Sequence, residues 1–159
     1  MKQVIEINKI EELVKYNLGK TIVLVGGCFD ILHLGHITFL EKAKEKGDIL
    51  IVLLESDFNI KNNKGQNRPV NNQENRAVFL SKLKMVDYIV KLPEMKNDQD
   101  YFEIINKIKP QIIAVSEEDK NLTKKKNQAK KVGAKLIKVT KPIPYQSTSR
   151  IIEIITDSF

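Results

Sequence analysis

The sequence is poor in several features that mark particular classes of protein. It has one cysteine in 159 residues, which excludes an internal disulfide framework and favours a reducing compartment such as the cytoplasm. It has no tryptophan and only 6% aromatic residues, so stacking platforms for single-stranded nucleic acid are scarce. No apolar run approaches the roughly 18 residues that a membrane-spanning helix needs. We therefore expect neither a membrane nor nucleic acid among its partners.

The N-terminus also lacks the pattern of a signal peptide, a basic segment followed by an apolar one. Its first residues, MKQVIEINKIEEL, are acidic and amphipathic, and we interpret them as mature sequence. The length suits one compact domain and leaves little room for a second. We expect a single domain over residues 1–159, with residues 1–19 as a helical lead-in.

The chain has an excess of positive charge, +7, from 27 Lys and Arg against 20 Asp and Glu. Such an excess suits an enzyme with polyanionic phosphate substrates, and it also suits a nucleic-acid-binding protein. Many of the lysines fall in Lys120–Lys131, which we interpret as the solvated face of a helix. A basic nucleic-acid-binding module remains an alternative, which predicts salt-sensitive binding without turnover.

Apolar, β-branched segments alternate along the chain with amphipathic ones. The expected strands are Thr21–Val25, Ile49–Leu54, Tyr88–Val90, Gln111–Val115 and Lys135–Val139. The expected helices are Ile7–Tyr16, Gly35–Lys46, Glu74–Lys84, Asp98–Ile108, Lys120–Val132 and Ser147–Ile155. The polar segment Glu55–Asn75 is expected to be a long loop. This pattern predicts an α/β fold with a doubly wound parallel sheet, whose ligand lies beyond the carboxyl ends of the strands.

The only two histidines, His33 and His36, lie in the segment Gly26–His36, which reads GGCFDILHLGH. The segment follows a strand and begins a helix, where unpaired amides and the helix dipole favour a phosphate. The spacing of three residues puts both imidazoles on one side of the first turn. Gly27 permits a tight turn and a close approach of ligand, and Gly35 removes a side chain that would crowd the phosphates. Two imidazoles facing one phosphate can stabilise the charge of an in-line displacement.

This segment resembles the HxGH signature of the cytidylyltransferase-like nucleotidyltransferase superfamily, a group with a Rossmann-like fold. Two further motifs agree in order and distance. Asn75–Leu80 (NRAVFL) resembles the helix start that follows a mobile loop in this group, and Gln146–Ile151 (QSTSRI) resembles its C-terminal Ser/Thr motif beside the phosphates. The likeness runs from about Lys20 to Ile155.

Within the superfamily, the chain is most similar to the adenylyltransferase domain for heptose 1-phosphate. The likeness lies in the segments Gly27–His33, Lys64-Gly65, Arg68–Asn71 and Val86–Tyr88. No sugar-kinase domain accompanies it, so we expect a stand-alone transferase. The group usually carries a Gly-rich segment ending in Asp after the fourth strand, whereas here Ser116–Lys120 reads SEEDK. Glu118 or Asp119 then takes the place of the acid.

The resemblance implies a role for each residue that matches a motif. It implies His33, His36 and Lys64 as catalytic residues. The expected nucleotide-binding residues are Gly27, Cys28, Phe29, Asp30, Gly35, Lys61, Arg76, Glu118, Asp119, Ser147, Thr148 and Ser149. Lys61, Lys64 and Arg76 would clamp the β- and γ-phosphates, and the helix end at 147–149 would close the site. Asp30 has an equally good structural interpretation, as a cap or a tie between loops.

The expected reaction joins a nucleoside monophosphate, with AMP favoured, to a phosphorylated small molecule and releases pyrophosphate. Mg²⁺ would be held by the triphosphate oxygens, with no metal site on the protein itself. The superfamily resemblance also implies a homodimer. CTP remains an alternative donor, because glycerol-3-phosphate and phosphoethanolamine cytidylyltransferases share the three motifs, as do FMN adenylyltransferases. A nucleotide sensor without activity is a further alternative, suggested by the altered Ser116–Asp119 segment.

Overall fold

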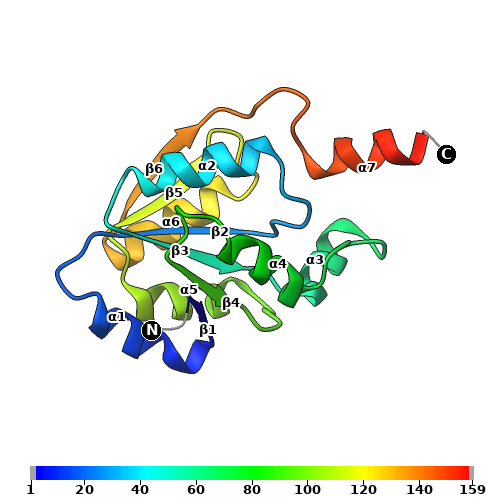
Figure 1. Ribbon diagram of the computed structural model, residues 1–159. Helices are drawn as coiled ribbons and strands as arrows, with labels where there is room; N and C mark the ends of the chain where they lie inside the picture. Colours follow the sequence, from blue (N-terminus) through cyan, green and yellow to red (C-terminus); the bar gives the residue numbers. More distant parts are fainter. Residues whose placement is uncertain (1–2, 158–159) are drawn as a thin grey trace.

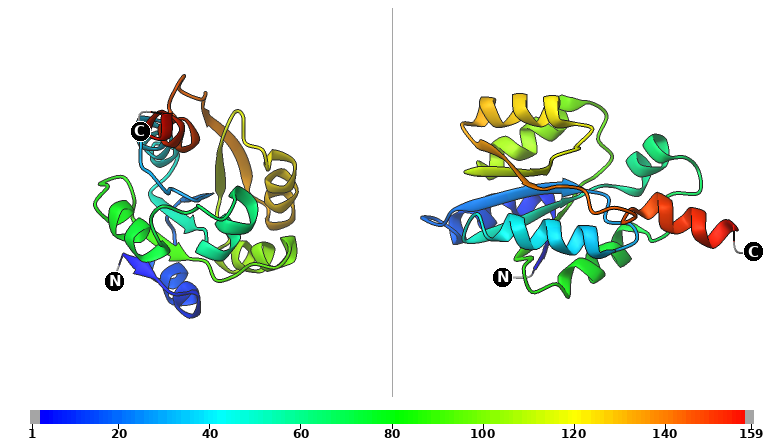
Figure 2. Two further views of the ribbon diagram at one scale, coloured as in Figure 1. Left: turned by 90° about the vertical axis from the view of Figure 1, so that its right-hand side faces the viewer. Right: turned by 90° about the horizontal axis from the view of Figure 1, so that it is seen from above.

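The computed structural model describes residues 3–157, and in this part of the chain six parallel strands form one sheet with helices on both faces (Figures 1 and 2). The strands are β1 (Val4–Ile5), β2 (Ile22–Gly27), β3 (Ile49–Leu54), β4 (Tyr88–Lys91), β5 (Ile112–Ser116) and β6 (Lys135–Thr140). Their order across the sheet is β1-β4-β3-β2-β5-β6, and every pairing is parallel. The predicted fold class is confirmed.

The helices cover the sheet because strand residues alternate between two buried faces. Ile22 and Leu24 of β2 belong to a core with residues of α1, α5 and α6, whereas Val23 and Val25 belong to a core with residues of α2 and α4. The helical elements are η1 (Ile7–Lys9), α1 (Ile10–Tyr16), α2 (Leu34–Lys44), α3 (Asp57–Lys64), α4 (Gln73–Ser81), α5 (Asp98–Ile108), α6 (Leu122–Val132) and α7 (Thr148–Asp157). Figure 2 shows the two helical layers, and Figure 1 shows α7 projecting from the body.

The predicted loop Glu55–Asn75 is wrong in its first part, because Asp57–Lys64 forms α3. Ser56 caps this helix by accepting a hydrogen bond from the Asn59 amide, and Asp57 lies in the first turn, where the dipole favours an acid. The helix is polar, and Ile60 is its only buried apolar residue, so its sequence shows no apolar period. The two-residue strand β1 was also not predicted, because it is too short to show a pattern.

The chain reverses its direction across the sheet at β2. Strands β3 and β4 follow on one side of β2, while β5 and β6 lie on the other. In doubly wound sheets, such a reversal opens a crevice at the carboxyl ends of the two central strands. β2 ends here in Gly26-Gly27 and β5 ends in Ser116, so the motif segment follows directly from the crevice.

We predict that Leu40→Ala lowers the free energy of unfolding by about 2–5 kcal/mol, because Leu40 is fully buried between α2 and the sheet. Urea denaturation measures this loss. Leu18→Ala is the matched control, because Leu18 is 76% exposed and its truncation should change stability by less than about 0.5 kcal/mol. Equal effects of the two substitutions would contradict the described packing of α2.

Candidate active site

A pocket of about 250 Å³ lies at the crevice between the carboxyl ends of β2 and β5. One part of its lining comes from the motif segment: Gly26, Gly27, Cys28, Phe29, His33, Gly35 and His36. The other part comes from α2 and the ends of β5 and β6: Phe39, Ser116, Asp119, Thr140, Lys141, Pro142, Ile143 and Gln146. The fold therefore brings the first and last thirds of the sequence to one site.

The two histidines lie together at the start of α2. His33 is the N-cap residue with an extended backbone, and the His36 amide donates to the His33 carbonyl at 2.9 Å. Their rings stack, with centroids 3.8 Å apart and an interplanar angle of 27°. A Cβ on Gly35 would come within 3.0 Å of the His33 ring. The absence of a side chain at Gly35 therefore leaves room for the His33 ring. The sequence had predicted that it leaves room for phosphates.

Both imidazoles are held in their neutral forms. Burial lowers the pKa of His36 to about 4, and the charges of His33 and Lys64 add to this effect against an opposing hydrogen bond with the Ile31 carbonyl. Burial also lowers the pKa of His33. The Nδ1 atom of each ring is buried and has no hydrogen-bond partner in the described part of the chain. A neutral imidazole has one N–H and one lone pair, so each Nδ1 atom is available to a ligand as a donor or as an acceptor according to the tautomer.

Phe29 fixes the position of the histidine pair. Its ring is buried in the core, and the ring centroid is 5.2 Å from that of His36. Phe29 has a left-handed backbone with φ of 46°, and a Cβ on Gly27 would lie 2.8 Å from its ring. The space beside Gly27 is therefore occupied by Phe29, which turns the chain and packs against a catalytic candidate.

Lys64 is the last residue of α3, and its charge is close enough to lower the pKa of His36. Lys64 itself is not among the residues that line the pocket. Lys61 lies one turn earlier on the same helix and is exposed. Contact of either lysine with phosphate stays a prediction.

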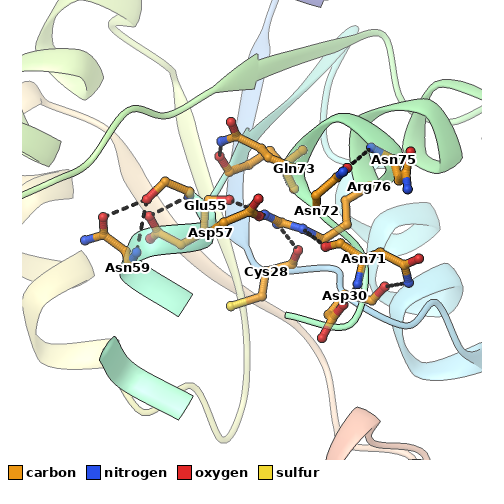
Figure 3. Close-up of polar contacts among 12 residues, drawn as sticks. Cys28, Asp30, Glu55, Asp57, Asn59, Asn71, Asn72, Gln73, Asn75 and Arg76 are labelled. Atoms are coloured by element: carbon orange, nitrogen blue, oxygen red, sulfur yellow. Dashed lines mark hydrogen bonds and ion pairs between the residues drawn. The ribbon is translucent and has the colours of Figure 1, made fainter. Parts of the chain in front are cut away.

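Arg76 does not have the position that was expected of a phosphate ligand. Its side chain is fully buried, and its nitrogens donate to protein acceptors on four segments (Figure 3). The acceptors are the carbonyls of Asn71 at 2.9 Å, Cys28 at 2.6 Å and Glu55 at 2.8 Å, and the carboxylate of Asp57 at 2.6 Å. The position of Arg76 at a helix start suggested that an anion balances its charge. The sequence could not show that carbonyls and a carboxylate of the protein itself accept its hydrogen bonds.

Asp30 ties two loops together. Its carboxylate accepts from the amides of Val70 and Asn71, each at 2.9 Å, and from Arg68 Nε at 2.7 Å. Burial raises the pKa of Asp30, but these hydrogen bonds outweigh burial and leave the pKa below its ordinary value. The structural interpretation is therefore confirmed, and the expected nucleotide contact through this side chain is not supported.

The structure distinguishes between Glu118 and Asp119, the two candidates for the acid of the site. Asp119 lines the pocket, where Lys125 Nζ at 2.7 Å and the Asn121 amide at 2.8 Å hold its carboxylate, whereas Glu118 is exposed and lies outside the lining. The choice between the two acids therefore falls on Asp119.

The expected residues of the C-terminal motif, Ser147, Thr148 and Ser149, are not among those that line the pocket. Ser147 Oγ accepts from the Arg150 amide, Thr148 is buried with its hydroxyl donating to the Ile31 carbonyl at 3.3 Å, and Ser149 is exposed. Gln146 lines the pocket instead. No sequence motif indicated that residues 140–143 line the pocket, although their place after the last strand could have done so.

Comparison with known proteins identifies this arrangement. Residues 24–154 match the cytidylyltransferase-like family. The chain belongs to this family. The membership confirms the predicted class of enzyme, a nucleotidyltransferase with a Rossmann-like fold.

Relatives of this cytidylyltransferase-like chain are bifunctional HldE proteins. The protein of Campylobacter concisus is 37% identical over 96% of the chain, and that of Campylobacter jejuni strain RM1221 is 40% identical over 91%. The chain spans only 30% of the length of each of them. The single-domain, stand-alone arrangement therefore stays a prediction.

Solved structures agree with the fold. A lipopolysaccharide core biosynthesis protein from Thermoplasma volcanium aligns with a TM-score of 0.64 at 29% identity, covering 80% of this chain and all of that one. A pantoate-β-alanine ligase from Francisella tularensis aligns with a TM-score of 0.68 at 18% identity, covering 99% of this chain and 77% of that one, and this likeness concerns the fold alone. No helix within residues 3–157 is both long and apolar enough to cross a bilayer.

We predict that Arg76→Met lowers the free energy of unfolding by about 3 kcal/mol or more, because it removes a fully buried cation that binds three partly buried carbonyls and a carboxylate. Chemical denaturation measures the loss. Arg150→Met is the control, because Arg150 forms only an exposed ion pair with Glu153, and its removal should cost less than about 1 kcal/mol. A stable Arg76→Met protein with weakened nucleotide binding would instead support the phosphate role.

We predict that His36 makes the fold sensitive to mild acid. Its pKa is lowered from 6.5 to about 4, so its neutral form contributes stability that is full above pH 6.5 and is lost as the pH falls towards 4. The free energy of unfolding of the wild type, minus that of His36→Asn, should fall across this range. Urea denaturation at several pH values measures this difference, and a constant difference would show that His36 does not titrate this way.

Proposed function

We propose that the protein transfers AMP from ATP to a sugar 1-phosphate, with heptose 1-phosphate as the favoured acceptor, and releases pyrophosphate. The observation that carries the proposal is the stacked, neutral histidine pair at a helix start that opens into the crevice, where the charge of Lys64 acts on His36. The heptose acceptor is supported by the motif resemblance and by relatives named bifunctional HldE proteins over nearly the whole chain.

In the proposed reaction, an oxygen of the acceptor phosphate attacks the α-phosphorus of ATP. The new P–O bond forms as the bond between the α-phosphorus and the bridging oxygen breaks, and pyrophosphate leaves with the electron pair. His33 and His36 donate hydrogen bonds to the α-phosphate oxygens, on which negative charge grows, and Lys64 and Lys61 offset the charge of the leaving group. Because the imidazoles are partly buried, these bonds are stronger than they would be in water.

Mg²⁺ enters this proposal bound to ATP. Within residues 3–157, no group of three or more His, Cys, Asp or Glu side chains is arranged to hold a metal ion. Triphosphate oxygens are natural ligands of Mg²⁺, and the metal would neutralise part of their charge. Asp119, the acid in the pocket lining, already accepts from Lys125 and fits a polar contact with the nucleoside better than a metal site.

The remaining expectations belong to the same proposal. We take the substrates to be small molecules rather than nucleic acid or a membrane, and the compartment to be the cytoplasm, in agreement with the single cysteine. The superfamily resemblance supports a homodimer. These points are open to light scattering and to binding measurements with oligonucleotides at two salt concentrations.

We predict that the protein releases pyrophosphate from ATP when heptose 1-phosphate is present, and does so much more slowly with CTP. A pyrophosphate-release screen of ATP and CTP against heptose 1-phosphate, FMN, glycerol 3-phosphate and phosphoethanolamine measures this. Turnover with CTP alone would show that the protein is a cytidylyltransferase and would contradict the proposal. Nucleotide binding without turnover would support a sensor instead.

Variants test the mechanism in the same assay. His36→Ala should lower kcat by about 100- to 1,000-fold, because a preorganised donor to the α-phosphate is lost. Lys64→Met should lower kcat as well, whereas Lys84→Met, an exposed lysine after α4, should leave it unchanged. Unchanged turnover in His36→Ala would exclude the proposed mechanism.

A further inference from the structure

A polar pair made of a carboxylate and a phenol, Glu55 and Tyr101, lies beside the pocket. Glu55 follows the carboxyl end of β3, and Tyr101 projects from α5. The Tyr101 hydroxyl donates to Glu55 Oε2 at 2.7 Å, and the Ser56 amide donates to Glu55 Oε1 at 3.1 Å. Neither contact was expected from the sequence, and the proposed transfer of AMP uses neither residue.

The backbone joins this pair directly to the pocket lining. The Glu55 amide donates to the Gly27 carbonyl at 3.1 Å, and the Arg76 guanidinium binds the carbonyls of both Cys28 and Glu55 (Figure 3). Gly27 and Cys28 both line the pocket. Glu55 is therefore held beside the motif segment on the β3 side of β2, whereas the β5 and β6 segments complete the pocket on the other side.

Tyr101 holds the carboxylate in one orientation. Burial raises the pKa of the Tyr101 phenol, and the charge of Glu55 and the Cys28 thiol add to the effect. The phenol therefore keeps its proton and remains the donor. Each of the two Glu55 carboxylate oxygens then accepts one protein hydrogen bond, whereas a carboxylate has room for about four.

The charges around Glu55 oppose a phosphate. Asp57, whose side chain is 45% exposed, lies two residues away, and Arg76 donates to the Asp57 carboxylate and to the backbone carbonyl of Glu55. The Glu55 carboxylate itself accepts from Tyr101 and from the Ser56 amide rather than from this guanidinium, whereas the charge of Lys64 acts on His36. An acceptor with an anionic end and a hydroxyl-rich end matches this division, because carboxylates bind hydroxyl donors well.

We propose that Glu55, positioned by Tyr101, binds hydroxyl groups of the acceptor and selects phosphorylated polyols. The inference rests on the proposed function and names the part of the site that recognises the carbon skeleton. The acceptor's phosphate points to His33 and His36, and its hydroxyl groups point to Glu55. Glu55 is then a specificity-determining residue, and Tyr101 is a positioning residue.

Steady-state kinetics with ATP and heptose 1-phosphate test this inference. Glu55→Ala should raise the KM for heptose 1-phosphate by about 10- to 100-fold, since a hydrogen bond to a charged group is lost. Glu55→Gln should raise it less, because the amide oxygen still accepts, and Tyr101→Phe should raise it by a few fold. The KM for ATP should remain unchanged in all three variants. Glu103→Gln, an exposed glutamate on α5, is the matched control and should behave as the wild type.

The outcomes separate the two proposals. If the wild type releases pyrophosphate but the Glu55 variants keep its KM for heptose 1-phosphate, this inference is wrong and the proposed function stands. Equal increases of the KM for ATP and for heptose 1-phosphate would assign Glu55 a structural role and also overturn it. If the wild type shows no turnover with heptose 1-phosphate, the proposed function fails, and the inference fails with it.

Discussion

The carboxyl edge of this sheet depends on one buried guanidinium. Arg76 binds backbone carbonyls at the ends of two neighbouring strands, a carboxylate on α3, and a carbonyl in the loop before α4. Loops of this kind carry polar backbone groups that water would normally satisfy. A planar donor with five N–H groups can satisfy several of them at once, which an ammonium group could not do. The segments that form the site are thereby fixed to one another before any ligand arrives.

This rigidity explains how the imidazoles can be catalytic groups. His33 and His36 stack on each other, and Phe29 packs against His36 from the core. Burial keeps the rings neutral, and polar atoms of both rings have no partner in the described part of the chain. Such an arrangement is unfavourable for the free protein and favourable once phosphate oxygens accept the hydrogen bonds. Hydrogen bonds that the free protein does not form at these atoms are therefore available to a ligand.

The sequence predicted much of this molecule because its strands and helices have strong local patterns. β3 and α5 were predicted with their observed bounds, and the histidine motif led directly to the crevice. The errors concern features set by tertiary contacts. The polar helix α3 has no apolar period, since its place is fixed by a cap and by the pairing of Asp57 with Arg76. A charge in a motif cannot by itself distinguish a ligand contact from a buried structural role, and Arg76 and Asp30 both bind protein groups in the structure.

The pocket has a loosely packed wall, formed by residues 140–143 and Gln146, and a closely packed floor, formed by Gly27 and Phe29. Residues 140–143 and Gln146 line the pocket, yet none of them belongs to either buried core. Gly27 and Phe29, by contrast, are constrained by close packing. Mutations in the wall therefore carry little thermodynamic penalty, whereas mutations in the floor disturb the whole edge of the sheet. Substitutions in this short segment can therefore change the shape of the pocket while the floor beside the histidines is retained.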